Sequence, residues 1–115
     1  MKDLGFFTRI FLAIDPVDFR KHAHGLALIA ESTMGISGVN EKYLFVFTNR
    51  RKTGIKMLYW DLTGYALWWK TLEKDKFRWP KNATEVLTIP VKELKWLLEG
   101  IDISKLKKHE KIILT

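Results

Sequence analysis

The chain has 115 residues, of which 47% are hydrophobic and 29% are charged, and it contains no cysteine. This length and composition are typical of a folded globular protein with a core of its own. The lack of cysteine excludes disulfides, thiolate nucleophiles and cysteine-ligated zinc, and it fits a reducing cytoplasm.

The net charge of +7 is concentrated in one part of the chain. Residues 50–81 hold nine Lys and Arg against three Asp and Glu, a net charge of +6, whereas residues 1–49 are neutral. Four of the five tryptophans lie in the same segment, namely Trp60, Trp68, Trp69 and Trp79. Cations interleaved with aromatic residues favour a binding surface for an anionic partner.

The N-terminal part predicts a strand followed by a helix. Residues 4–14 are apolar but too short to span a membrane, and they lack the features of a signal peptide, so we expect no membrane contact. Residues 9–14 are predicted to form the strand. Asp15 is then placed to cap a helix, with Pro16 at its first position, and residues 35–38 are expected to end it.

The rest of the chain predicts an antiparallel meander and a second helix. Strands are expected over residues 43–48, 55–60, 65–70, 76–79 and 85–89. Pro90 and Gly100 are expected to bound the helix. The apolar face of this helix would carry Val91, Leu94, Leu98 and Ile101. We therefore predict an α+β fold: one domain over residues 1–103, in which a meander of about four to five strands packs with an N-terminal and a C-terminal helix. A basic, mobile tail is expected over residues 104–115.

Two interpretations of the tryptophans remain open. Strand alternation places Lys56 on the same sheet face as Leu58 and Trp60, while Ile55, Met57 and Tyr59 take the other face. If the turn at residues 61–64 pairs Trp60 with Tyr65, Leu67 and Trp69 join the Lys56 face. The tryptophans fit a core best, but Trp60, Trp69 and Trp79 are also candidates for contact with a protein partner.

The loop at residues 49–54 is the strongest candidate for a binding site. Arg50, Arg51 and Lys52 are crowded there with no acidic neighbour, and clustered cations gain affinity for DNA by displacing its counterions. Further candidate phosphate contacts are Lys56, Lys70, Lys76 and Arg78. Arg20 and Lys21 are predicted near the positive end of the first helix, an unfavourable place that suggests a partner contact.

Nothing in the sequence predicts catalysis. The thirteen acidic residues are scattered, and the chain has no nucleophile elbow, phosphate-binding glycine loop or dinucleotide fingerprint. His22 and His24 are two residues apart and lack further ligands, so we expect no metal, no cofactor and no small-molecule substrate. The least favoured alternative is a small Mg²⁺-dependent nuclease that uses Asp61 or Glu73.

Three blocks of the sequence resemble a known family. An N-terminal block contains Asp18, Arg20-Lys21 and Gly25-Leu26. The central block runs from Leu44 to Phe47 through Arg50-Arg51, Ile55-Lys56, Leu58, Trp60-Asp61, Gly64, Leu67, Lys70, Leu72-Glu73 and Phe77 to Trp79-Pro80, and the C-terminal one is Leu97 to Asp102. Together they resemble the TnpB-type accessory protein, the second reading frame, of the IS-sixty-six class of bacterial insertion sequences.

The resemblance implies an accessory role in the bacterial cytoplasm beside a separate, larger transposase, and it supplies no catalytic residue. The chain departs from the family pattern at His22, Ala23-His24 and Thr71, which weakens the case for an essential contact near them. Two hypotheses follow. The chain binds DNA, at the element ends or at the target, or it docks on the transposase through its exposed aromatic residues without binding DNA.

Overall fold

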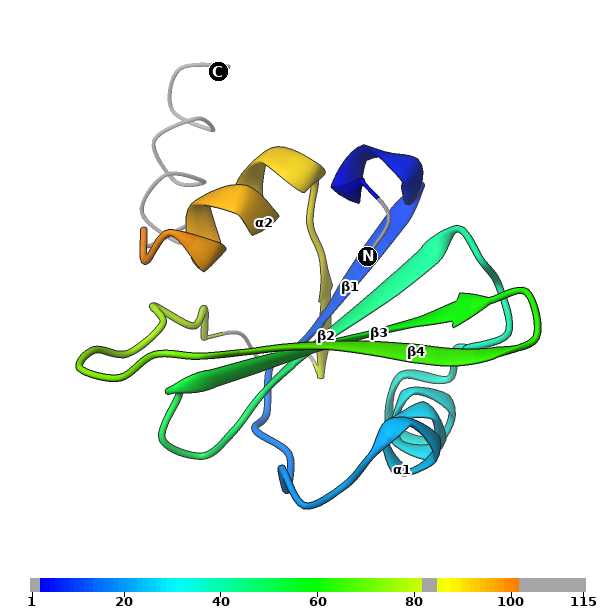
Figure 1. Ribbon diagram of the computed structural model, residues 1–115, viewed down its shortest axis with the longest axis horizontal. Coiled ribbons are helices and arrows are strands. Elements are labelled where there is room, and N and C mark those ends of the chain that lie inside the picture. Colours follow the sequence, from blue (N-terminus) through cyan, green and yellow to red (C-terminus); the bar gives the residue numbers. More distant parts are fainter. Residues whose placement is uncertain (1–2, 82–84, 102–115) are drawn as a thin grey trace.

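The computed structural model describes residues 3–81 and 85–101, where five strands form one sheet with a helix on each side (Figure 1). The elements in chain order are a 3-10 turn η1 (Leu4–Phe6), β1 (Arg9–Ala13), α1 (Ala23–Ile29), a π-helical turn η2 (Ala30–Met34), β2 (Tyr43–Thr48), β3 (Gly54–Asp61), β4 (Gly64–Thr71), β5 (Val86–Thr88) and α2 (Val91–Leu98). This confirms the predicted α+β class. The expected tail, residues 104–115, lies outside the described residues.

The sheet is mixed, with the strand order β4-β3-β2-β1-β5. The predicted antiparallel meander is confirmed for β2, β3 and β4, and β5 adds antiparallel to β1. The sequence does not predict a partner for β1, and the structure pairs it with β2 in parallel, which makes the sheet mixed. The long connection through α1 allows this, since parallel neighbours need a crossover and cannot be joined by a tight turn.

Each face of the sheet carries a hydrophobic core, as strand alternation predicts. Trp60 pairs with Tyr65 and Lys56 with Trp69, which is the predicted register. On one face, a cluster joins the sheet to α1 and η2 and includes Phe45, Phe47, Leu58, Leu26, Ala27 and Ala30. On the other face, a cluster joins it to α2 and includes Leu44, Val46, Ile55, Met57, Tyr59, Leu94 and Leu97.

The segment before α1 is a loop, so the predicted helix start at Asp15 is wrong. The backbone N–H of Val17 donates to the carbonyl of Thr48 at 2.9 Å, and the Asp18 carboxylate accepts from the Arg20 backbone N–H at 2.9 Å. These bonds fix a non-helical path, because short polar side chains compete with the helix for backbone donors. The helix begins only at Ala23.

Both helical segments end at the glycines that the sequence predicts. Gly35 and Gly100 both have positive φ, 71° and 91°, in the conformation that favours glycine after a helix. The apolar face of α2 differs in part from the prediction, because Leu94 and Leu97 are buried whereas Ile101 is exposed. The predicted strand over residues 76–79 is wrong, and residues 72–81 form an irregular loop. No helix within residues 3–81 and 85–101 is long and apolar enough to cross a membrane.

We predict that Gly54→Ala destabilises the fold by roughly 1–3 kcal/mol, the usual cost of overpacking. A Cβ at this buried position would lie 2.6 Å from Cε2 of Phe19, so the loop before α1 would have to move. The measurement is urea unfolding against Gly64→Ala, where no atom lies within 4 Å of the added Cβ. Equal stability of the two variants would contradict the close packing of Phe19 on β3.

Candidate nucleic-acid interface

The β2–β3 hairpin tip is a rigid turn that presents two arginines. The Asn49 carboxamide oxygen accepts the backbone N–H groups of Thr53 at 2.9 Å and Gly54 at 3.2 Å, and its amide donates to the Thr53 hydroxyl at 3.0 Å. Lys52 adopts a left-handed conformation with φ 60°. These local bonds shape the turn without help from Arg50 or Arg51, whose side chains are exposed.

The loop over residues 72–81 runs beside this tip and is held to it by the backbone. The N–H of Leu72 donates to the carbonyl of Thr53 and that of Phe77 to the carbonyl of Lys52, both at 2.8 Å. Phe77 and Trp79 are buried and anchor the loop in the core. Two segments far apart in sequence are thereby joined into one surface.

We call this combined patch the basic surface, and it consists of Arg50, Arg51, Lys52, Lys74, Lys76, Arg78 and Lys81. All seven side chains are exposed or partly exposed. With Glu73 and Asp75 included, residues 49–53 and 72–81 carry a net charge of +5. Within residues 3–81 and 85–101, no carboxylate forms an ion pair with any of the seven cations. The charge is therefore available to an external anion.

Two shallow clefts flank the loop over residues 72–81. One, of about 330 Å³, is lined by Lys52, Asp75, Lys76, Phe77, Arg78, Trp79 and Lys81. The other, also about 330 Å³, brings Lys70 next to Lys76 beside the end of α2, where the Lys70 ammonium lies 3.4 Å from the carbonyl of Leu98. Six cations other than Lys56 are predicted to contact DNA, and all six lie on or next to the basic surface.

The exposed role expected for Lys56 is wrong, because its side chain is fully buried (0% exposed). Its ammonium donates to the backbone carbonyls of Phe19 at 2.8 Å and Lys21 at 2.9 Å. It also lies 4.3 Å from the ring centre of Trp69 and 4.8 Å from that of Phe19. Burial lowers the pKa of this lysine. Lys56 thus holds the loop before α1 on the sheet and cannot reach a phosphate.

The tryptophans proposed as partner contacts are not gathered on one surface. Trp79 is 7% exposed and its indole N–H donates to the carbonyl of Ala13 at 2.9 Å, so its predicted role as a partner contact is wrong. Trp60 is partly buried, and its ring packs edge-on against Tyr65. It lies at the far end of β3, about 20 Å along the strand from the hairpin tip. Trp69 alone of the three is well exposed, at 57%.

Arg20 and Lys21 are exposed in the loop before α1 instead of in a helix. Arg20 forms an ion pair with Asp18, with Nη2 2.6 Å from Oδ2. The side-chain hydrogen bond from Arg20 lowers the pKa of Asp18 to about 2, so this carboxylate stays ionised at neutral pH. Arg20 is therefore satisfied within the chain, unlike Arg50 and Arg51.

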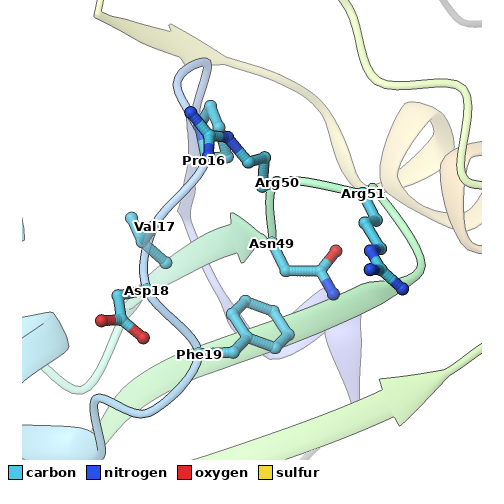
Figure 2. A pocket seen from close by; sticks show the side chains of 7 residues that line it. All are labelled: Pro16, Val17, Asp18, Phe19, Asn49, Arg50 and Arg51. Atoms are coloured by element: carbon cyan, nitrogen blue, oxygen red, sulfur yellow. The ribbon is translucent and has the colours of Figure 1, made fainter.

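A larger cleft of about 550 Å³ lies on the opposite side of the hairpin tip (Figure 2). Its walls are residues 16–19 of the loop before α1 and residues 49–51 of the tip. Phe19 and Asn49 could not be predicted as lining residues, since only the tertiary structure brings these loops together. Within residues 3–81 and 85–101, no group of three or more His, Asp or Glu side chains could hold a metal ion.

Comparison with known proteins identifies the family. The family model described as IS66 Orf2-like protein matches residues 8–108. The chain is 32% identical over 103 residues to the uncharacterized protein y4jC of Sinorhizobium fredii, covering 87% of this chain and 85% of that protein. It is 30% identical over 95 residues to the uncharacterized protein y4hO of the same organism, covering 83% and 82%. No solved structure matches. The chain belongs to the IS66 Orf2-like family, whose role is that of an insertion-sequence accessory protein.

Proposed function

We propose that the chain binds DNA through the basic surface and assists the transposase of its own element in the bacterial cytoplasm, without catalysing a reaction itself. The observation that carries the proposal is the gathering of seven cations from two segments, none of them paired with a carboxylate of the described chain. Phosphate contacts by Arg and Lys release counterions from DNA, which favours binding at element ends or at the target.

Salt dependence tests this proposal directly. With about five or six phosphate contacts, the logarithm of affinity should fall against that of salt concentration with a slope of roughly −5. The double variant Arg50→Ala, Arg51→Ala should make the slope shallower by about 2. The measurement is fluorescence anisotropy with element-end DNA over a range of salt concentrations.

The matched control removes two cations from the other end of the sheet. Arg9 and Lys42 are exposed and lie where β1 and β2 begin, whereas the hairpin tip follows the end of β2. Arg9→Ala, Lys42→Ala should leave the slope nearly unchanged. If both double variants change the slope equally, binding is a matter of net charge and the basic surface is not the contact.

One observation favours a second function, docking on the transposase. Trp69 is exposed and lies 6.0 Å, ring centre to ring centre, from Phe19, close to the exposed Arg20 and Lys21. Exposed Trp and Arg are the residues most enriched at the centres of protein interfaces. Retention of the transposase in nuclease-treated lysate, together with no DNA binding by the chain alone, would favour docking. If the Trp69→Ala variant no longer retains the transposase, the docking site includes Trp69.

A further inference from the structure

The cleft between residues 16–19 and residues 49–51 is held open by the fold on both sides. The Val17 N–H is bound to the Thr48 carbonyl, and the buried Lys56 ammonium holds the carbonyl of Phe19. The hairpin wall is fixed by the side-chain bonds of Asn49. Binding there would therefore cost little ordering of the protein.

The cleft combines three kinds of chemistry. Arg50 and Arg51 supply two guanidinium groups, Phe19 supplies an aromatic ring, and Asp18 supplies a carboxylate whose two oxygens both accept hydrogen bonds from Arg20. Phe19 lies between Asp18 and Arg51 (Figure 2). Because Lys56 is buried, its ammonium covers the Phe19 ring from inside the protein while the ring also lines the cleft.

This combination does not suit a phosphate backbone alone. A free anion or the backbone of paired DNA would use the two arginines but would leave the Phe19 ring without a partner. An unpaired nucleotide offers phosphates for the arginines and a flat base for the aromatic ring. The arginines and the Phe19 ring of the cleft therefore match the phosphates and the base of an unpaired nucleotide.

We propose that this cleft binds one unpaired nucleotide of DNA, with its base stacked on Phe19 and the phosphates on its two sides contacted by Arg50 and Arg51, whose guanidinium groups lie on opposite sides of the cleft (Figure 2). The proposal rests on the DNA-binding function above and deepens it. The chain would favour DNA with unpaired bases, such as a single-stranded flap or an opened end, over a continuous duplex.

The test compares two DNA substrates of equal length and charge, a continuous duplex and one with a short unpaired bubble. The wild-type chain should bind the bubble about tenfold more tightly, the gain expected from stacking one base on an aromatic ring. The fluorescent base 2-aminopurine in the bubble should be quenched on binding. Phe19→Leu should abolish the preference and the quenching while duplex binding is retained.

Two further variants keep the test decisive. Phe11→Leu makes the same change at a partly buried position in β1, where Phe11 stacks on Phe45, and should leave the preference intact. Val17→Leu narrows the cleft without adding a ring or changing charge, and it replaces Phe19→Leu if that variant does not fold, as judged by thermal melting.

The outcomes separate this inference from the proposed function. Equal affinity of the wild-type chain for bubble and duplex, with the salt slope as predicted, overturns the inference alone. A preference that survives both Phe19→Leu and Val17→Leu also overturns it, because the base then stacks elsewhere. No binding to either DNA overturns both proposals.

Discussion

Replacing Trp79 with alanine should destabilise the protein by about 3–5 kcal/mol, the usual cost of truncating a buried tryptophan. Its ring is 7% exposed in the core beneath α2, and its indole N–H donates to the carbonyl of Ala13 on β1. The variant leaves a cavity and an unsatisfied backbone carbonyl. Because a domain of this size is stable by only about 5–15 kcal/mol, the loss should be plain in urea unfolding.

Trp69→Ala is the matched control for this change. Trp69 is 57% exposed, so its truncation should cost about 1 kcal/mol or less. Trp79→Ala should also loosen residues 72–81, and hydrogen exchange at the Phe77 amide should rise as its bond to Lys52 opens. A cost for Trp79→Ala no greater than that for Trp69→Ala would contradict the role of Trp79 as the anchor of the basic surface.

Replacing Lys56 with methionine should cost about 2–3 kcal/mol in the free energy of unfolding. Methionine fills much of the space of the lysine stem but leaves the carbonyls of Phe19 and Lys21 without their donor. Each unsatisfied buried acceptor costs about 1–3 kcal/mol, and relief of the buried charge offsets part of this. Hydrogen exchange should also increase at Val17, whose amide lies in the loop that Lys56 holds.

Lys70→Met is the control, because the same substitution at an exposed position should change the free energy of unfolding by about 0.5 kcal/mol or less. Lys56→Met should in addition remove any preference for unpaired DNA, since the Phe19 wall of the cleft would no longer be fixed. A Lys56→Met protein as stable as the wild type, with an unchanged rate of exchange at Val17, would show that the buried ammonium does not hold this loop.

Much of the sheet could be predicted because its signals are local. The alternation from Gly54 to Asp61, the turn after it and the β-branched and aromatic run at 43–48 define strands and register without tertiary information. The partner of β1 could not be predicted this way. Parallel or antiparallel pairing depends on how the connection through α1 packs, and no residue of β1 itself records it.

The errors at the candidate site have one physical cause, competition between local and tertiary bonds. Asp15 and Pro16 fit a helix start, but Lys56 and Thr48 bind the backbone of the segment that follows and hold it in a non-helical loop. The sequence predicts Lys56 as a phosphate contact, but the residue belongs to the small class of lysines that are fully buried. Two carbonyls and two aromatic rings provide it with an internal site that its position in the sequence does not reveal.

Arg50 and Arg51 could be placed correctly because a tight hairpin leaves its central side chains outside the sheet. Lys74 and Lys81 were missed, since only the main-chain bonds at Leu72 and Phe77 bring them beside the tip. The alternation of basic and aromatic residues over 76–79 predicts a strand, but here it does not come from pairing in a sheet. Phe77 and Trp79 point into the core and Lys76 and Arg78 point outward, without a neighbouring strand.

This arrangement separates the positions that maintain the loop from those proposed to contact DNA. The path of residues 72–81 is set by two buried aromatic rings and by backbone bonds that any amino acid except proline can make. Lys74, Lys76, Arg78 and Lys81 take no part in that framework. On the proposed function, exchanging these four side chains can therefore change how strongly the chain holds DNA, while the scaffold that displays them stays intact.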